Sequence, residues 1–277
     1  MTLAATSFIL PDMDGPMETF YRCLLNASPV EVRTLTAAEM KGLEDVYQNV
    51  VFDRDGPWYM QGDRSPRDQW YYERLLLPFR AIHDSYDTLQ DVAVYLRHFP
   101  YRGTRVSPLR HLRHNIRIYF EEAYVLRQRL IDYLNILEKD YARSRQEKEL
   151  NAINAPLCRL LKKRLKSIID ARTLHVHKGG YDDDRLRRLD TLELLSACLP
   201  GDAIGGKRRA SVYKHMYASA YRNERKRWER LAMDCNLIVE QLIDFYFSKL
   251  MPIIFAPDGK VISPPLADTY GPRSEPT

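Results

Sequence analysis

The residues best suited to chemistry lie in the stretch ARTLHVHKGGYDDD, residues 171–184. Arg172 stays charged and can bind two oxygens of a phosphate, while His175 and His177 can exchange protons near neutral pH. The same stretch is also how a basic helix ends, because a Gly-Gly pair follows and glycine favours a helix stop. The sequence therefore leaves two interpretations, a catalytic edge or an ordinary helix terminus.

The spacing of apolar residues before Arg172 predicts the helix face on which the arginine side chain lies. Steps of three and four residues extend an apolar stripe from Leu161 through Leu165 and Ile168 to Arg172 and His175. On such a face an arginine commonly buries its aliphatic stem and places its guanidinium on a carboxylate. The alternative is that this end of the face opens onto a cleft or a partner subunit, where the cation contacts a ligand.

The histidine spacing does not favour a metal site. In a helix, His175 and His177 are separated by about 200°, so the two rings do not share a face. His111 and His114 do share a helix face, but no Glu-x-x-His motif accompanies them. We therefore expect no metal and no cofactor.

Helix start and stop signals place this stretch within a series of helices. Ser65-Pro66 opens a helix towards Phe99, which Pro78 should bend or interrupt. Ser107-Pro108 opens a long helix with apolar residues at steps of three and four as far as Leu137. Three further helices are expected: one from near Pro156 to about His177, one from YDDDRLRRL to LPGDAIGG, and one from roughly Arg208 to Leu250.

The expected fold class is all-α, because no run of alternating β-branched residues occurs. It is an antiparallel bundle of about four core helices, with an additional N-terminal helical region. We divide the chain into an N-terminal appendage (1–64) with capping boxes at 28–31 and 36–39, a bundle (65–255) with its core at 107–250, and a Pro-rich tail (256–277). The residues predicted to share the core are Leu130, Leu161, Leu165, Ile238 and Leu242.

The composition is that of a soluble globular protein, with 45% hydrophobic and 29% charged residues among 277. We expect no secretory signal and no membrane helix, since no apolar run approaches the roughly 20 residues needed. The four cysteines are scattered without a C-x-x-C pair, as in a cytoplasmic protein with reduced thiols.

The net charge of +5 is distributed unevenly along the chain. Residues 1–100 carry 9 Lys/Arg and 15 Asp/Glu, while residues 101–277 carry 33 and 22. A basic region favours polyanions, although a solvated helix face has a similar composition. The cations selected as candidate nucleic-acid contacts are Lys207, Arg208, Arg209, Lys214 and Arg222.

The tyrosines of the same segment have two interpretations. Tyr213, Tyr217 and Tyr221 could stack on unpaired bases. Their spacing of four is also that of a packing seam within the bundle, which is the interpretation that we favour.

The motif Arg172-Thr-Leu-His-Val-His177 has the form R-x4-H, near the end of a helix in a basic helical bundle. It resembles the HEPN superfamily, which is defined by R-x4-6-H, and the similarity covers residues from about 107 to 250. Active members usually place Asn, Asp or His directly after the arginine, whereas here Thr173 follows. A toxin branch with tyrosine two residues after the histidine is not matched, since Gly179 occupies that place.

The resemblance implies a protein that acts on RNA, as a metal-independent endoribonuclease of a defence or toxin-like system. Arg172 would bind the scissile phosphate and His177 would act as acid and base, with His175, Thr173 and Lys178 in support. Members usually pair two motifs in a homodimer, and a neutralising partner protein would fit a toxin. Two alternatives stay open: an inactive HEPN-like module that binds nucleotide, RNA or protein, and a helical protein with a chance R-x4-H.

Overall fold

The chain forms an all-α bundle in the computed structural model, which describes residues 15–27, 65–98, 105–177, 183–198 and 206–265. In chain order the elements are α1 (Pro16–Asn26), α3 (Pro66–Trp70), the π-helical segment η2 (Tyr71–Leu76), α4 (Leu77–Arg97), α5 (Pro108–Asp140), α6 (Glu147–Arg164), α7 (Lys166–His177), α8 (Asp184–Cys198) and α9 (Gly206–Ile254). These described residues contain an isolated bridge between Phe255 and Val261 and no strand.

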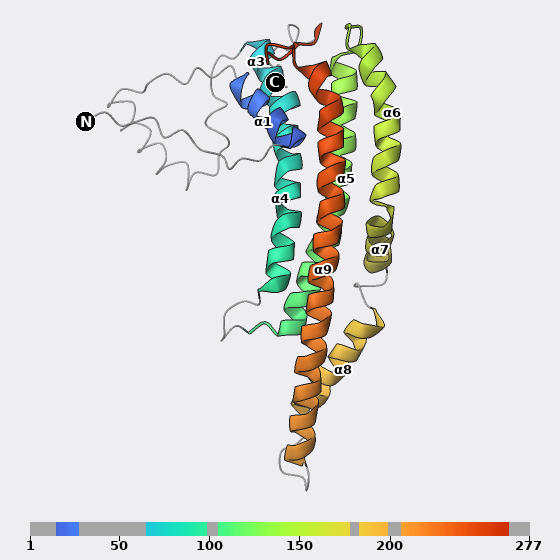
Figure 1. Ribbon diagram of the computed structural model, residues 1–277. Coiled ribbons are helices and arrows are strands. Elements are labelled where there is room, and N and C mark those ends of the chain that lie inside the picture. Colours follow the sequence, from blue (N-terminus) through green and yellow to red (C-terminus); the bar gives the residue numbers. More distant parts are fainter. Residues whose placement is uncertain (1–14, 28–64, 99–104, 178–182, 199–205, 266–277) are drawn as a thin grey trace, which may run out of the picture.

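The long helices lie side by side along one axis (Figure 1). Helices α4, α5 and α6–α7 run in alternating directions, and α9 spans the whole bundle. The later half of α9 packs against α1, α4 and α6, while α8 lies along its earlier half. Because α7 packs against α5, the motif helix lies on the side of the bundle away from α1.

The predicted helix starts at the two Ser-Pro pairs are confirmed. The hydroxyl oxygens of Ser65 and Ser107 accept hydrogen bonds from the amides of Asp68 and Arg110, each at 3.2 Å, and proline follows each serine. A serine oxygen thus satisfies an amide that has no partner within the helix.

The interruption predicted at Pro78 is also present. The segment η2 widens to π-helical geometry immediately before α4, which begins at Leu77. Proline supplies no amide hydrogen, and its ring crowds the carbonyl four residues earlier, so the regular helix cannot pass through it unchanged.

The core lies between α4, α5, α6 and α9 and is mostly leucine and aromatic. Of the five predicted core residues, Leu130, Leu161, Leu165 and Leu242 are buried. The prediction for Ile238 was wrong, since its side chain is 44% exposed. The core-facing residues near it on α9 are instead Ala232, Asn236, Val239 and Ile243.

The second predicted helix begins earlier and is divided. Helix α6 starts at Glu147, so Pro156 lies inside it rather than at its first turn. The helical run is then interrupted at Leu165, and α7 continues from Lys166 to His177. The exposed position of Pro156 makes this tolerable, because water can bond the carbonyl that its ring leaves without an amide.

The first residues of the Pro-rich tail lie against the end of the bundle. Ile262 donates its amide to the carbonyl of Ile254 at 2.9 Å, and the Tyr141 hydroxyl donates to the carbonyl of Ile262. Both predicted capping boxes, at 28–31 and 36–39, fall outside the described residues. Among the described helices, none has an apolar stretch long enough to cross a membrane.

Candidate functional site

The predicted stripe on the motif helix does lead to Arg172. Leu165 and Ile168 are buried, and the side chain of Arg172 follows them with 24% exposure. This face of α7 packs against α5, a helix of the same chain. The arginine is thus half-buried between two helices, and its neighbours come from α5.

Two residues of α5 hold the guanidinium of Arg172. Its Nε donates to Oε2 of Glu121 at 3.0 Å, and its Cζ lies 4.0 Å from the ring centroid of Tyr124. No described residue accepts a hydrogen bond from its Nη atoms. Glu121 engages the Nε atom, and no described residue occupies the Nη edge, the edge through which a guanidinium can bind two oxygens of one anion.

A second cation lies at the same tyrosine. The Cζ of Arg127 lies 5.2 Å from the Tyr124 ring centroid. The Nε atom of Arg127 is buried, and no hydrogen-bond partner for it is present in the described part of the chain. Arg172, Arg127, Tyr124 and Glu121, which we call the α5–α7 cluster, therefore combine two guanidinium groups with one carboxylate. Such a group can attract an anion.

Sequence reasoning found Arg172 but missed its three neighbours. Glu121, Tyr124 and Arg127 follow each other at steps of three on α5, beside the apolar stripe. This spacing shows that they share a side of the helix. It does not show which other helix packs there, so the sequence carried no signal that they meet Arg172.

Thr173 does not contribute its side chain to the cluster. Its hydroxyl donates to the carbonyl of Ile169 at 2.9 Å, one turn earlier in its own helix, and the residue is exposed. The hydroxyl is therefore engaged with the backbone. The other predicted residues of this motif lie outside the described part of the structure. They are the side chains of His175 and His177 and the whole of Lys178.

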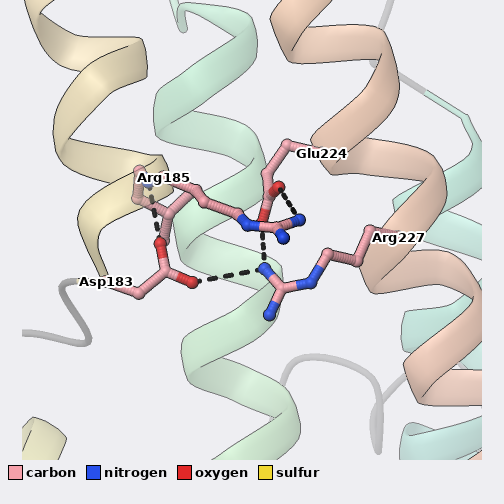
Figure 2. A network of polar contacts seen from close by, with 5 residues as sticks. Asp183, Arg185, Glu224 and Arg227 are labelled. Carbon is pink, nitrogen blue, oxygen red and sulfur yellow. Dashed lines mark hydrogen bonds and ion pairs between the residues drawn. The ribbon is translucent and has the colours of Figure 1, made fainter.

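The start of α8 is joined to α9 by a charged network (Figure 2). Asp183 caps α8 by accepting from the amide of Leu186 at 2.8 Å, and Nη1 of Arg227 lies 3.3 Å from its other oxygen. The same Nη1 donates to buried Glu224 at 2.5 Å, and Arg185 lies 3.8 Å from that carboxylate.

These contacts balance each other electrostatically. Burial opposes the charge of Arg227, but its bonds with Glu224 and Asp183 raise its pKa above the ordinary arginine value. Because the charges that face each other here are already paired, the network positions α8 on α9 and is not a free ligand site.

The two described cations among the predicted nucleic-acid contacts are exposed. Lys214 and Arg222 lie on the earlier half of α9, and neither forms an ion pair with any described residue. The Nε of Arg222 donates to the carbonyl of Ala218 at 3.2 Å. The side chains of Lys207, Arg208 and Arg209 lie outside the described part.

Two of the three tyrosines predicted to form a seam, Tyr217 and Tyr221, pack against the bundle, whereas Tyr213 is half-buried and is not among the residues packed on the described core. Tyr217 and Tyr221 stack with centroids 6.2 Å apart and are partly buried against the core. The hydroxyl of Tyr217 donates to Oε1 of Glu193 on α8 at 3.0 Å. These rings are therefore engaged within the protein and do not form an open stacking platform.

The described residues include no group of three or more histidine, cysteine, aspartate or glutamate side chains arranged to hold a metal ion. His111 lies with Nε2 3.1 Å from Nδ2 of Asn115, and burial lowers the pKa of its imidazole.

The chain matches no protein-family model, no curated protein and no solved structure.

Proposed function

We propose that this protein is a HEPN-like helical bundle that acts on RNA as a metal-independent endoribonuclease. The observation that supports the proposal best is the guanidinium of Arg172, which Glu121 and Tyr124 hold between α5 and α7 and whose Nη atoms bond to none of the described residues. A guanidinium fixed in this way loses little conformational freedom when it binds a phosphate.

The proposed reaction uses both ends of the motif. The 2′-oxygen of the RNA loses its proton, attacks the adjacent phosphorus and displaces the 5′-oxygen, which takes up a proton. A 2′,3′-cyclic phosphate and a 5′-hydroxyl result. Arg172 would bind the phosphate oxygens in the transition state, and His177 would exchange the protons. Each motif supplies one histidine assigned to proton transfer, His177, so a homodimer that brings together two motifs would complete the set.

Charge elsewhere on the chain supports a polyanionic substrate. Arg127 adds a second guanidinium beside Tyr124, and Lys214 and Arg222 are exposed on α9. Phosphate contacts of this kind provide affinity without base specificity. A neutralising partner protein and a role in defence belong to the same proposal, on the strength of the resemblance alone.

A second function, an inactive module that binds RNA, nucleotide or protein, is favoured by two specific contacts. Glu121 already neutralises Arg172, and the hydroxyl of Thr173 is bonded to Ile169 instead of the site. In such a module the α5–α7 cluster would bind an anion and perform no chemistry.

The test is a cleavage assay on structured and single-stranded RNA, with cyclic-phosphate ends as the product sought. Arg172→Ala and His177→Ala should each abolish cleavage, because phosphate binding and proton transfer serve one transition state. EDTA should have no effect. Arg145→Ala, which removes an exposed arginine from the α5–α6 turn, is the matched control. His175→Ala should reduce cleavage much less than His177→Ala, because in a helix its ring points well away from that of His177.

Cleavage that survives both motif substitutions, or that needs added divalent metal, would contradict the assignment. RNA binding that depends on Arg172 without any cleavage would establish the inactive module instead.

A further inference from the structure

A second site of unusual composition lies between α1, α4 and α9, on the other side of the bundle from α7 (Figure 1). It is a pocket of about 160 Å³. Its lining combines three carboxylic acids with one tyrosine and two apolar side chains, namely Glu18, Glu240, Asp244, Tyr86, Met17 and Ile243. No lining residue is basic.

One of the three carboxylates already has a partner. The amide of Met17, in the first turn of α1, donates to Oδ1 of Asp244 at 3.3 Å. Gly15 makes this approach possible, since a Cβ there would lie 3.0 Å from the same oxygen. Asp244 thus acts as the cap of α1 from another helix, where the positive end of the helix dipole also stabilises it.

The second carboxylate, that of Glu18, has no such partner among the described residues. Its side chain belongs to a residue that is only 7% exposed, and Oε1 is buried with no hydrogen-bond partner among the described residues. Burying a carboxylate without a partner is costly, so a group of this kind calls for an explanation. Glu240 lines the same pocket, is exposed, and forms no ion pair in the described part of the chain.

Tyr86 adds an aromatic wall. It is buried, and burial, followed by the nearby charges of Glu240 and Asp244, raises its pKa to about 12. The phenol therefore stays neutral at physiological pH. A neutral aromatic ring beside carboxylates is a combination that binds organic cations, through its electron-rich face as well as through charge.

We propose that this pocket binds an alkylammonium group, whose charge pairs with Glu18 and Glu240 and whose methylene chain contacts Met17, Ile243 and the ring of Tyr86. The volume of about 160 Å³ is roughly ten times what a single water needs, so it accommodates a short alkyl chain as well as a charged head. A bare metal ion suits the pocket less, because no metal-holding group of side chains occurs among the described residues. The site is independent of the proposed activity on RNA.

The test is calorimetric titration of the full chain with putrescine, a four-carbon diamine. We expect saturable binding. Glu18→Gln and Glu240→Gln should each weaken it at least about tenfold, because each removes a charged partner of the ammonium group. Asp234→Asn is the matched control: it removes an exposed carboxylate from the same helix as Glu240, away from the pocket, and should leave the affinity unchanged.

Two further titrations identify the source of the ammonium group. Nα-acetyl-lysine methylamide presents a lysine side chain, and tighter binding of this compound than of putrescine would assign the pocket to a protein partner. Magnesium chloride at matched ionic strength should not compete with putrescine.

The proposal is overturned if neither amine saturates, or if Asp234→Asn weakens binding as much as Glu18→Gln. It is also overturned if Glu18→Gln stabilises the chain but leaves putrescine affinity intact, since Glu18 would then be merely an unpaired buried acid.

Discussion

Arg172 and Glu121 form an ion pair of 3.0 Å between α7 and α5, with the Tyr124 ring 4.0 Å from the guanidinium carbon. This contact orients the arginine before any ligand arrives. It also places a negative charge beside the guanidinium that would bind a phosphate in the proposed function. The balance between these two effects can be measured on Glu121 itself.

Glu121→Gln should raise RNA affinity roughly two- to fivefold, because the pair is partly exposed and such pairs are worth about 0.2–1 kcal/mol. The glutamine oxygen can still accept from Nε of Arg172, so orientation is kept while the competing charge is lost. Fluorescence anisotropy with a short single-stranded RNA at fixed ionic strength measures the change. Asp132→Asn, an exposed position on the same helix, is the control. A loss of affinity would instead make Glu121 a positioning residue.

Asp140 should be among the most sensitive polar positions for stability. Its carboxylate accepts from Nε1 of Trp70 at 2.9 Å and from two nitrogens of Arg74 at 3.1 and 2.8 Å. Asp140→Ala would remove the acceptor of Trp70 Nε1 and the carboxylate paired with Arg74, at a cost of about 2–4 kcal/mol in the free energy of unfolding. Asp140→Asn keeps one acceptor and should cost less. Urea denaturation compares them, and equal losses would show that charge, not hydrogen bonding, dominates.

Leu165→Ala and Ile238→Ala separate two positions that the sequence pattern treats alike. Leu165 is buried at the junction of α6 and α7, so its truncation should cost about 2–5 kcal/mol. Ile238 is 44% exposed, and its truncation should cost less than about 1 kcal/mol. Urea denaturation of both variants decides this. Similar losses would mean that the outer face of α9 is covered in solution.

This contrast shows where sequence reasoning succeeds. The Ser-Pro pairs at Ser65 and Ser107 predicted helix starts because capping is a local interaction. The long apolar stripe on α5 predicted the buried face of that helix, because helical periodicity is also set within a single element. The prediction that Ile238 is buried was wrong, because the spacing of apolar residues along α9 does not indicate which of its faces α4 and α6 cover. That depends on tertiary packing.

The candidate site likewise divides into a part set by local spacing and a part set by tertiary packing. The pattern on the motif helix predicted that Arg172 would extend a buried face, and it does. Its acceptor Glu121 lies 51 residues away in the chain, and only the packing of α7 on α5 brings the two together. Pro156 illustrates a related difficulty: proline favours a first turn, yet an exposed face also tolerates it inside α6.

Alkaline pH should unfold this protein cooperatively, because many of its tyrosines are buried. Burial raises the pKa of Tyr86 to about 12 and raises those of Tyr71, Tyr119, Tyr133, Tyr141, Tyr217 and Tyr246 further, against an ordinary value of 10.0. The folded state therefore keeps protons that the unfolded state releases.

The direction of the change in stability with pH follows from this difference in protonation. Below about pH 10 both states hold these protons and stability is unaffected, whereas above it deprotonation stabilises the unfolded chain, so the free energy of unfolding falls as pH rises. Urea midpoints across this range, with tyrosinate absorbance, measure the loss. Tyr246→Phe removes one such group, whose hydroxyl donates to the carbonyl of Leu130 at 2.7 Å. This variant should be less stable at neutral pH but lose less stability on alkalinisation. Parallel curves for the two proteins would show that other groups govern the alkaline limit.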